Sequence, residues 1–252
     1  MNAQLPAAPV ESAIDPTVQL VVTSIMACFA LAALITSLVY WARSGKPTIF
    51  MLFISGGAMM VMEPFVDLVG CCWHPANGWH VFTAYGRPMP LWLCLVYFFY
   101  FGIGVGVTWI LMKRGLSRAQ LWGMFVANML GDIVLEVTLL HFDTYYYYGG
   151  QPLVFMKFPL WWAAANGLIT MVAATIVYRH EQYLRGWRQL LILPISWTCY
   201  VGAAAVTSWP SWLVINTDTS WPVMQLGGIA TFALACWFMS LVVTMVEKPA
   251  SN

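Results

Sequence analysis

Seven stretches of mostly apolar residues constrain the fold of this chain more than any other feature. A helix that crosses a bilayer needs about 20 mostly apolar residues, and each stretch has roughly that length. They are Val18–Trp41, Thr48–Gly70, Pro90–Met112, Gln120–Leu140, Pro159–Tyr178, Gln189–Ser208 and Val223–Val246. Only 8% of the 252 residues are charged, against about 25% in a soluble domain. We therefore predict an all-α, polytopic membrane protein in which residues 1–252 form a single seven-helix domain.

The distribution of basic residues between the loops predicts the orientation in the membrane. One set of loops carries Arg43, Lys46, Lys113, Arg114, Arg118, Arg179, Arg185, Arg188 and Lys248. The other set carries only Arg87 and Lys157. Because basic loops stay in the cytoplasm, we expect the N-terminus outside and the C-terminus in the cytoplasm, in a bacterial inner membrane. The N-terminal tail has no basic residue, so the first span is expected to stay as an anchor and not to be cleaved as a signal peptide.

Charge and cysteine spacing exclude several classes of protein. A formal net charge of +1 argues against nucleic-acid binding through a basic surface. The six cysteines show no CxxC spacing, which argues against a zinc knuckle or a thioredoxin-type pair. The vicinal Cys71 and Cys72 are expected to be the only exposed thiols. We expect no metal and no cofactor; the expected partners are the lipid bilayer and a lipophilic small-molecule substrate, and the oligomeric state is left open.

Two hairpins resemble each other at an offset of 69 residues, measured from Glu63 to Asp132. The second span contains Glu63-x-x-x-Asp67 and the fourth contains Asp132-x-x-x-Glu136. The third span opens with Pro90-Leu91-Trp92 and the fifth with Pro159-Leu160-Trp161. The pattern predicts an internal two-helix repeat with copies at about 48–112 and 120–178, whose active groups meet between the copies.

The four acids of these motifs are the candidate catalytic residues: Glu63, Asp67, Asp132 and Glu136. Within each pair the i, i+4 spacing places both carboxyls on one helix face. Each costs about 2.5–3.5 kcal/mol at mid-membrane, and such groups are functional by default. We expect them to converge on one cavity open to the outside. Low dielectric and a neighbouring carboxylate favour the neutral acid, so at least one member of each pair is expected to be protonated. The alternative is that protonated carboxyls only tie helices together.

Polar and aromatic residues around the acids are candidates for substrate binding. They are Trp73, His74, Arg87, Trp92, Asn128, His141, Tyr145, Trp161, Trp162 and Asn166. Alternatives remain open: an interfacial aromatic belt for the tryptophans, a solvated rim for the histidines, a headgroup anchor for Arg87, and helix-to-helix contacts for the asparagines. Pro64 is expected to kink its helix and leave the Met60 carbonyl without its helical partner. The glycines at 102, 104 and 106 predict close helix packing.

Several motifs together resemble the bacterial AveC-type spirocyclase family. They are Glu63-Pro64-x-x-Asp67 with Trp73-His74-Pro75, Gly86-Arg87-Pro88-Met89-Pro90-Leu91-Trp92, Tyr147-Tyr148-Gly149-Gly150-Gln151-Pro152-Leu153 and Phe158-Pro159-Leu160-Trp161-Trp162. The resemblance covers about the second to the fifth span. The namesake of the family forms the spiroketal of a polyketide in avermectin biosynthesis. The resemblance therefore implies an integral-membrane cyclase of secondary metabolism.

Our leading hypothesis is an intramembrane cyclase, of the isomerase or lyase class, that works by acid catalysis. Spiroketal formation joins two hydroxyls to a ketone with loss of water. A protonated carboxyl, a neighbouring carboxylate and aromatic faces supply the proton donor, the proton acceptor and the stabilisation of a cation. We assign Asp132 or Glu63 as the acid, with Glu136 and Asp67 as base or electrostatic partner.

Other functions fit part of the pattern. A terpenoid or meroterpenoid cyclase would use the same acids to protonate an epoxide or alkene. A proton-coupled transporter would also need intramembrane acids and an internal repeat. A membrane prenyltransferase is disfavoured, because only Arg87 and Lys157 lie outside to balance a diphosphate. A retinal photoreceptor is excluded, because Val223–Val246 contains no Schiff-base lysine.

Overall fold

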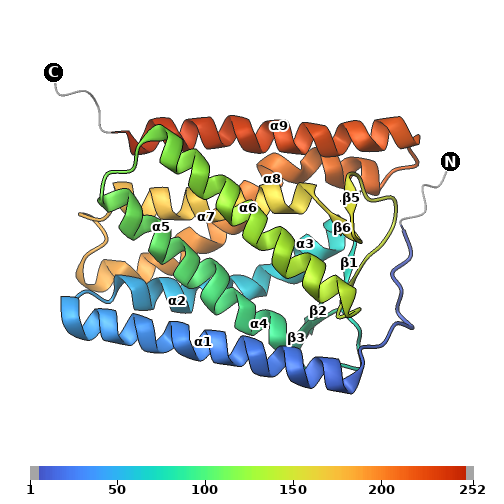
Figure 1. The fold of residues 1–252 in the computed structure, drawn as a ribbon, viewed down its shortest axis with the longest axis horizontal. Coiled ribbons are helices and arrows are strands. Elements are labelled where there is room, and N and C mark those ends of the chain that lie inside the picture. Colours follow the sequence, from blue (N-terminus) through green and yellow to red (C-terminus); the bar gives the residue numbers. More distant parts are fainter. Residues whose placement is uncertain (1–5, 248–252) are drawn as a thin grey trace.

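The computed structural model describes residues 6–247 and shows a bundle of seven long apolar helices (Figure 1). The spans are Pro16–Ser44, Thr48–Gly70, Leu91–Lys113, Arg118–His141, Trp161–Arg179, Gly186–Ile215 and Trp221–Val246. Each is long and apolar enough to cross a membrane. The prediction of seven helical spans is thereby confirmed. Most ends differ by three residues or fewer, but the sixth span ends at Ile215 and not at Ser208. Lys248, one of the basic residues used to predict orientation, lies outside the described residues.

The spans map onto the labelled elements as follows. Four are single helices: α1 (Pro16–Ser44), α6 (Arg118–His141), α7 (Trp161–Arg179) and α9 (Trp221–Val246). The second is α2 (Thr48–Met59), η1 (Met60–Met62) and α3 (Glu63–Gly70); the third is α4 (Leu91–Tyr97), η2 (Phe98–Ile103) and α5 (Gly104–Lys113); the sixth is η3 (Gly186–Leu191) and α8 (Ile192–Ile215).

The second span is interrupted where its sequence contains proline. A 3₁₀ turn, η1, separates α2 from α3, and Pro64 stands in the first turn of α3. The predicted break at Pro64 is confirmed, but the Met60 carbonyl is not left without a partner. It accepts the N–H of Glu63 in an i to i+3 hydrogen bond, the tighter pattern that 3₁₀ geometry allows. Glu63 therefore begins a new helix segment.

Close packing of α2 against η2 confirms the prediction for Gly102 but not for Gly104, where an added Cβ would meet no atom nearer than 3.9 Å. A Cβ on Gly56 would lie 2.4 Å from the backbone nitrogen of Gly102, and one on Gly102 would lie 2.9 Å from the Cα of Phe53. The two backbones approach so closely because neither glycine carries a side chain. η2 is a π-helical segment, an irregularity that is frequent at functional sites.

The loops at one end of the bundle form six short strands that the all-α prediction does not include (Figure 1). They are β1 (Cys72–Trp73), β2 (His80–Ala84), β3 (Arg87–Pro90), β4 (Tyr146–Tyr147), β5 (Val154–Phe155) and β6 (Phe158–Pro159). β2 and β3 form a hairpin whose turn residues, Tyr85 and Gly86, both have positive φ, as a type I′ turn requires. β1 pairs with β4, which ties the loop after α3 to the loop after α6.

The helices are packed around α7, which is the most buried span. α7 packs closely against α5, α6, α8 and α9. α6 packs closely along α7 and α9 but not along α4, η2 or α5. Large apolar side chains such as Phe29, Leu130 and Val134 are exposed on the outer faces of the helices. Such a surface is suited to lipid and not to water.

Candidate functional site: a cavity lined by carboxyls

All four acids of the two motifs line one cavity. Its volume is about 50 Å³, and eight aromatic side chains contribute to its walls: Trp92, Tyr97, Tyr100, Phe101, Tyr145, Tyr147, Trp162 and Tyr200. Within residues 6–247, no lysine or arginine forms an ion pair with any of the four carboxyls. The cavity therefore gathers acidic groups that no lysine or arginine of the described residues neutralises. The expected convergence of the four acids is confirmed, whereas their catalytic roles remain predictions.

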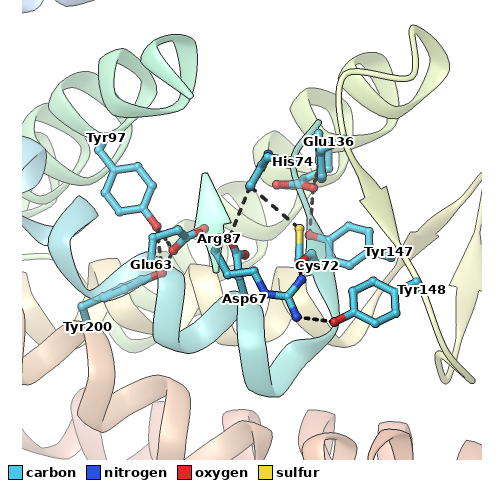
Figure 2. A network of polar contacts seen from close by, with 11 residues as sticks. Glu63, Asp67, Cys72, His74, Arg87, Tyr97, Glu136, Tyr147, Tyr148 and Tyr200 are labelled. Carbon is cyan, nitrogen blue, oxygen red and sulfur yellow. Dashed lines mark hydrogen bonds and ion pairs between the residues drawn. The ribbon is translucent and has the colours of Figure 1, made fainter. Parts of the chain in front are cut away.

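Glu63 is held by two tyrosine hydroxyls from different spans (Figure 2). Tyr97, at the end of α4, and Tyr200, in α8, both donate to Oε2 of Glu63. The two hydroxyl oxygens are also 2.7 Å from each other. This cluster fixes the Glu63 carboxyl between three helices.

Glu136 is held in a similar way by the loop that follows its own helix. Tyr145 and Tyr147 donate to its Oε2, and the Tyr147 oxygen lies at 3.1 Å. Burial, and after it the charge of Glu136, raises the pKa of both phenols well above the usual value. Both therefore stay neutral and can act as hydrogen-bond donors at physiological pH.

Asp132 has fewer donors than either glutamate. Its side chain is 2% exposed, and both of its oxygens lie 3.2 Å from the side-chain amide nitrogen of Asn166 in α7. Asp132 and Glu136 lie one turn apart on α6, as the spacing predicts. The starting position of α6 is defined by a capping box between Ser117 and Gln120, a strong signal for a helix N-terminus.

Asp67 belongs to a third group, with Cys72 and His74 (Figure 2). Nε2 of His74 lies 3.3 Å from Oδ2 of Asp67 and 4.0 Å from Sγ of Cys72. The chain folds back here because Cys71, which ends α3, adopts the left-handed conformation with φ 54°. Burial, and after it the charge of Asp67, raises the pKa of the Cys72 thiol well above its usual value.

The expectation that Cys71 and Cys72 are the only exposed thiols is wrong. Both are buried, at 2% and 3% exposure, whereas Cys28 and Cys236 are exposed. The sequence suggests a loop because the segment follows a span. In the structure, the pairing of β1 with β4 draws it inside, so that Cys72 lines the cavity.

Five of the ten predicted binding residues line the cavity: His74, Trp92, Tyr145, Trp162 and Asn166. The structure places the other five elsewhere: Trp73, Arg87, Asn128, His141 and Trp161. Arg87 is buried and donates to the Cys72 carbonyl at 2.9 Å and to the Tyr148 hydroxyl, and its guanidinium lies 5.3 Å from the Trp73 ring. Arg87 and Trp73 therefore stabilise the loop that follows α3 and do not form part of the cavity wall.

The remaining three predicted binding residues lie outside the cavity wall, each in a different environment. Trp161 is fully buried behind Trp162, against which it stacks with ring centroids 4.5 Å apart. His141 is exposed at the end of α6. Asn128 is one turn before Asp132, does not line the cavity, and has no hydrogen bond on its amide nitrogen.

Sequence reasoning missed several lining residues, chiefly Cys72, Tyr97, Tyr100, Phe101, Tyr147 and Tyr200. Tyr200 is the most informative, because it comes from the sixth span, where no acid pair indicates a function. A tyrosine hydroxyl in the middle of an apolar span is itself a signal, since a buried hydroxyl needs a partner. The partner of the Tyr200 hydroxyl is Glu63, however, which lies 137 residues away in sequence.

The lining residues that keep partial exposure indicate where the cavity is most accessible. Of the loop residues at its end, His74 and Tyr145 are 3% exposed, and Tyr147 is partly exposed. Leu93 on α4, Tyr100 on η2 and Leu135 on α6 are partly exposed. Of these elements, α6 does not pack closely on either α4 or η2. We therefore expect access from the side, between α6 and the α4–η2 segment, and the expected opening to the outside stays a prediction.

Comparisons of the chain with protein-family models, curated proteins and solved structures find no match. The resemblance to AveC-type spirocyclases therefore stays a prediction. The geometry of the cavity carries the functional argument.

Proposed function

We propose that this protein is an intramembrane cyclase that uses buried carboxyls for acid-catalysed, dehydrative cyclisation of a lipophilic, polyketide-like substrate to a spiroketal. One observation carries the proposal: four carboxyls meet in one aromatic-walled cavity without a lysine or arginine ion pair among the described residues, and three of them are held by tyrosine hydroxyls or an asparagine amide. Proton donors and acceptors held close together are what general acid–base catalysis requires.

In this mechanism Asp132 is the proton donor. Its oxygens receive only one amide, whereas one oxygen of Glu63 and one of Glu136 each receive two hydroxyls. Asp132 transfers its proton to the hydroxyl of a hemiketal, and the C–O bond breaks with loss of water. The second hydroxyl of the substrate attacks the oxocarbenium carbon and passes its proton to the Glu136 carboxylate. Aromatic faces stabilise the cation.

The orientation with the N-terminus outside and the two-helix repeat are part of the proposal. The loops with most of the basic residues lie at the end of the bundle opposite the strands (Figure 1), which supports a cytoplasmic location for that end. In both copies of the proposed repeat a short strand ending in proline precedes the span: β3 directly precedes α4, and β6 precedes α7 with Leu160 between them. Asp132 in α6 and Glu63 in α3 then occupy corresponding positions, and a bacterial inner membrane is the proposed location.

A terpenoid cyclase is the second candidate, favoured by the eight aromatic side chains of the cavity wall. Aromatic faces stabilise cations generally, so they serve carbocations as well as oxocarbenium ions. The two chemistries differ in mass balance: spiroketal formation releases a water, whereas protonation of an epoxide or alkene followed by ring closure gives an isomer. The mass of the product therefore separates them.

Substrate entry provides one prediction. A cavity of about 50 Å³ holds about three to five waters at about 10–15 Å³ each, so a larger substrate requires the wall between α6 and α4–η2 to open. Leu135→Trp, which enlarges a lining residue there, is expected to reduce kcat/KM by about tenfold or more. The control is Val134→Trp at the adjacent, 67% exposed position. Equal kcat/KM values for the two variants would argue against lateral entry.

The test of the proposed function is product analysis by mass spectrometry. Membranes containing the wild-type chain or Asp132→Asn are supplied with lipophilic dihydroxyketones and isoprenoid epoxides. A matched control is Glu181→Gln, since Glu181 pairs with Lys46 and Lys113 and does not line the cavity. We expect a product lighter by one water in the wild type and the control but not in Asp132→Asn. A product of unchanged mass would favour the terpenoid cyclase, and no conversion of any dihydroxyketone would count against spirocyclisation.

A further inference from the structure

We propose that Asp67, Cys72 and His74 bind a divalent transition-metal cation, most readily Zn²⁺, at the edge of the carboxyl-lined cavity. The three side chains offer one oxygen, one sulfur and one nitrogen, all buried and all within 4.8 Å of one another. The proposal is independent of the proposed cyclase activity, because it concerns the resting protein without substrate.

The geometry is close to that of a zinc site with three protein ligands. Zn–N and Zn–O bonds of about 2.0–2.2 Å and a Zn–S bond of about 2.3 Å place tetrahedral ligand atoms about 3.3–3.6 Å apart. Oδ2 of Asp67 and Nε2 of His74 are 3.3 Å apart. Sγ of Cys72 and Nε2 of His74 are 4.0 Å apart, so this edge shortens by about 0.5 Å when the metal binds.

A bound cation would also balance the buried negative charge of Asp67. Oδ2 of Asp67 is buried in a side chain that is 1% exposed, and it has no hydrogen bond. Its contact with His74 is the one ion pair that any of the four acids makes within residues 6–247. A buried charge without adequate partners is strongly unfavourable. A divalent cation would balance one carboxylate and one thiolate, leaving no net charge.

The surrounding structure holds the three ligands in place. The left-handed Cys71 turns the chain so that Cys72 and His74 come back over the last turn of α3, where Asp67 stands. Arg87 holds the Cys72 carbonyl at 2.9 Å. The His74 ring packs against both Trp92 and Tyr145, with centroid distances of 5.7 and 5.4 Å. Ligands oriented in advance by their neighbours are typical of metal sites.

The choice of metal follows from the ligands. Thiolate together with imidazole selects zinc or a similar transition metal, whereas Mg²⁺ and Ca²⁺ prefer oxygen ligands only. Three protein ligands leave a fourth position open, as in catalytic zinc sites. All three ligand residues line the cavity that contains Glu63, Asp132 and Glu136, so that position faces the space where a substrate oxygen would bind.

The test uses the full chain purified in detergent and equilibrated with Zn²⁺ or Co²⁺. We expect about one metal per chain by elemental analysis, and a thiolate-to-Co²⁺ charge-transfer band in the absorption spectrum. Cys72→Ser, Asp67→Asn and His74→Asn are expected to weaken metal affinity by more than the about 10–100-fold typical of outer-shell changes. Two controls, Cys71→Ser and His141→Asn, are expected to retain full affinity, because neither residue belongs to the three-ligand group.

Either of two results would overturn the proposal: wild-type protein that shows no thiolate-to-Co²⁺ band, or a band that persists in Cys72→Ser. The first needs no variant, so misfolding of a mutant cannot obscure it. Asp132→Asn is expected to bind the metal normally. Wild-type protein that binds the metal but converts no substrate would count against the proposed cyclase and not against the metal site. Wild-type protein that converts substrate but binds no metal would count against the metal site and not against the cyclase.

Discussion

Asp132→Asn is expected to reduce cyclase turnover by about 10²–10⁴-fold, the range associated with losing a general acid. The substitution keeps the volume of the side chain, and the new amide oxygen can still accept a hydrogen bond from Asn166, which lies 3.2 Å from the present carboxyl. What disappears is the transferable proton. The measurement is the initial rate of product formation in membranes that contain equal amounts of folded protein.

The matched controls for this prediction separate chemistry from folding. Glu181→Gln removes a carboxyl that pairs with lysines outside the cavity and is expected to leave the rate unchanged. Asn166→Asp removes the amide donor but adds a carboxyl, so it is expected to change the pH dependence of turnover and not only its size. Undiminished turnover of well-folded Asp132→Asn would remove Asp132 from the role of proton donor.

Gly56→Ala is expected to destabilise the folded protein by about 3 kcal/mol, at the upper end of ordinary overpacking. The added Cβ would lie 2.4 Å from the backbone nitrogen of Gly102 and 2.6 Å from the carbonyl oxygen of Tyr97. Backbone atoms cannot rotate away as side chains do, so α2 and η2 would have to separate. Since η2 directly follows Tyr97, the hydroxyl that holds Glu63 would move as well.

Thermal unfolding in detergent, monitored by size-exclusion chromatography, measures the effect of Gly56→Ala. The control is Gly123→Ala in α6, where a new Cβ meets no atom within 4 Å and alanine favours the helix by about 0.8–1.0 kcal/mol. We expect a clearly lower midpoint for Gly56→Ala and an equal or higher midpoint for Gly123→Ala. Identical midpoints for both variants would contradict the close approach of α2 and η2.

Hydropathy and spacing predict the local features of this protein well. The seven spans are visible because a helix must bury its own backbone polar groups in lipid, and only long apolar stretches can do so. The pairing of Asp132 with Glu136, and of Glu63 with Asp67, on single helix faces follows from the helical repeat. The break at Pro64 follows from the missing N–H of proline. Each of these depends on residues within a few positions of one another.

The partners of the acids depend on contacts that are remote in sequence. Tyr200 reaches Glu63 across 137 residues, and Asn166 reaches Asp132 across 34. Arg87, predicted at the cavity, instead holds the Cys72 carbonyl and Tyr148. No local pattern specifies these contacts, because they depend on which helix faces meet after packing.

The sequence by itself therefore determined that the chain crosses the membrane with seven helices and carries four acids within them. Only the tertiary structure decided that Asp67 lies beside Cys72 and His74, whereas the other three acids accept hydrogen bonds from tyrosines or an asparagine. The physical reason is the pairing of β1 with β4, which draws two loops over the end of the bundle. Strand pairing between distant loops is a long-range contact, whereas helix formation in lipid is a local one.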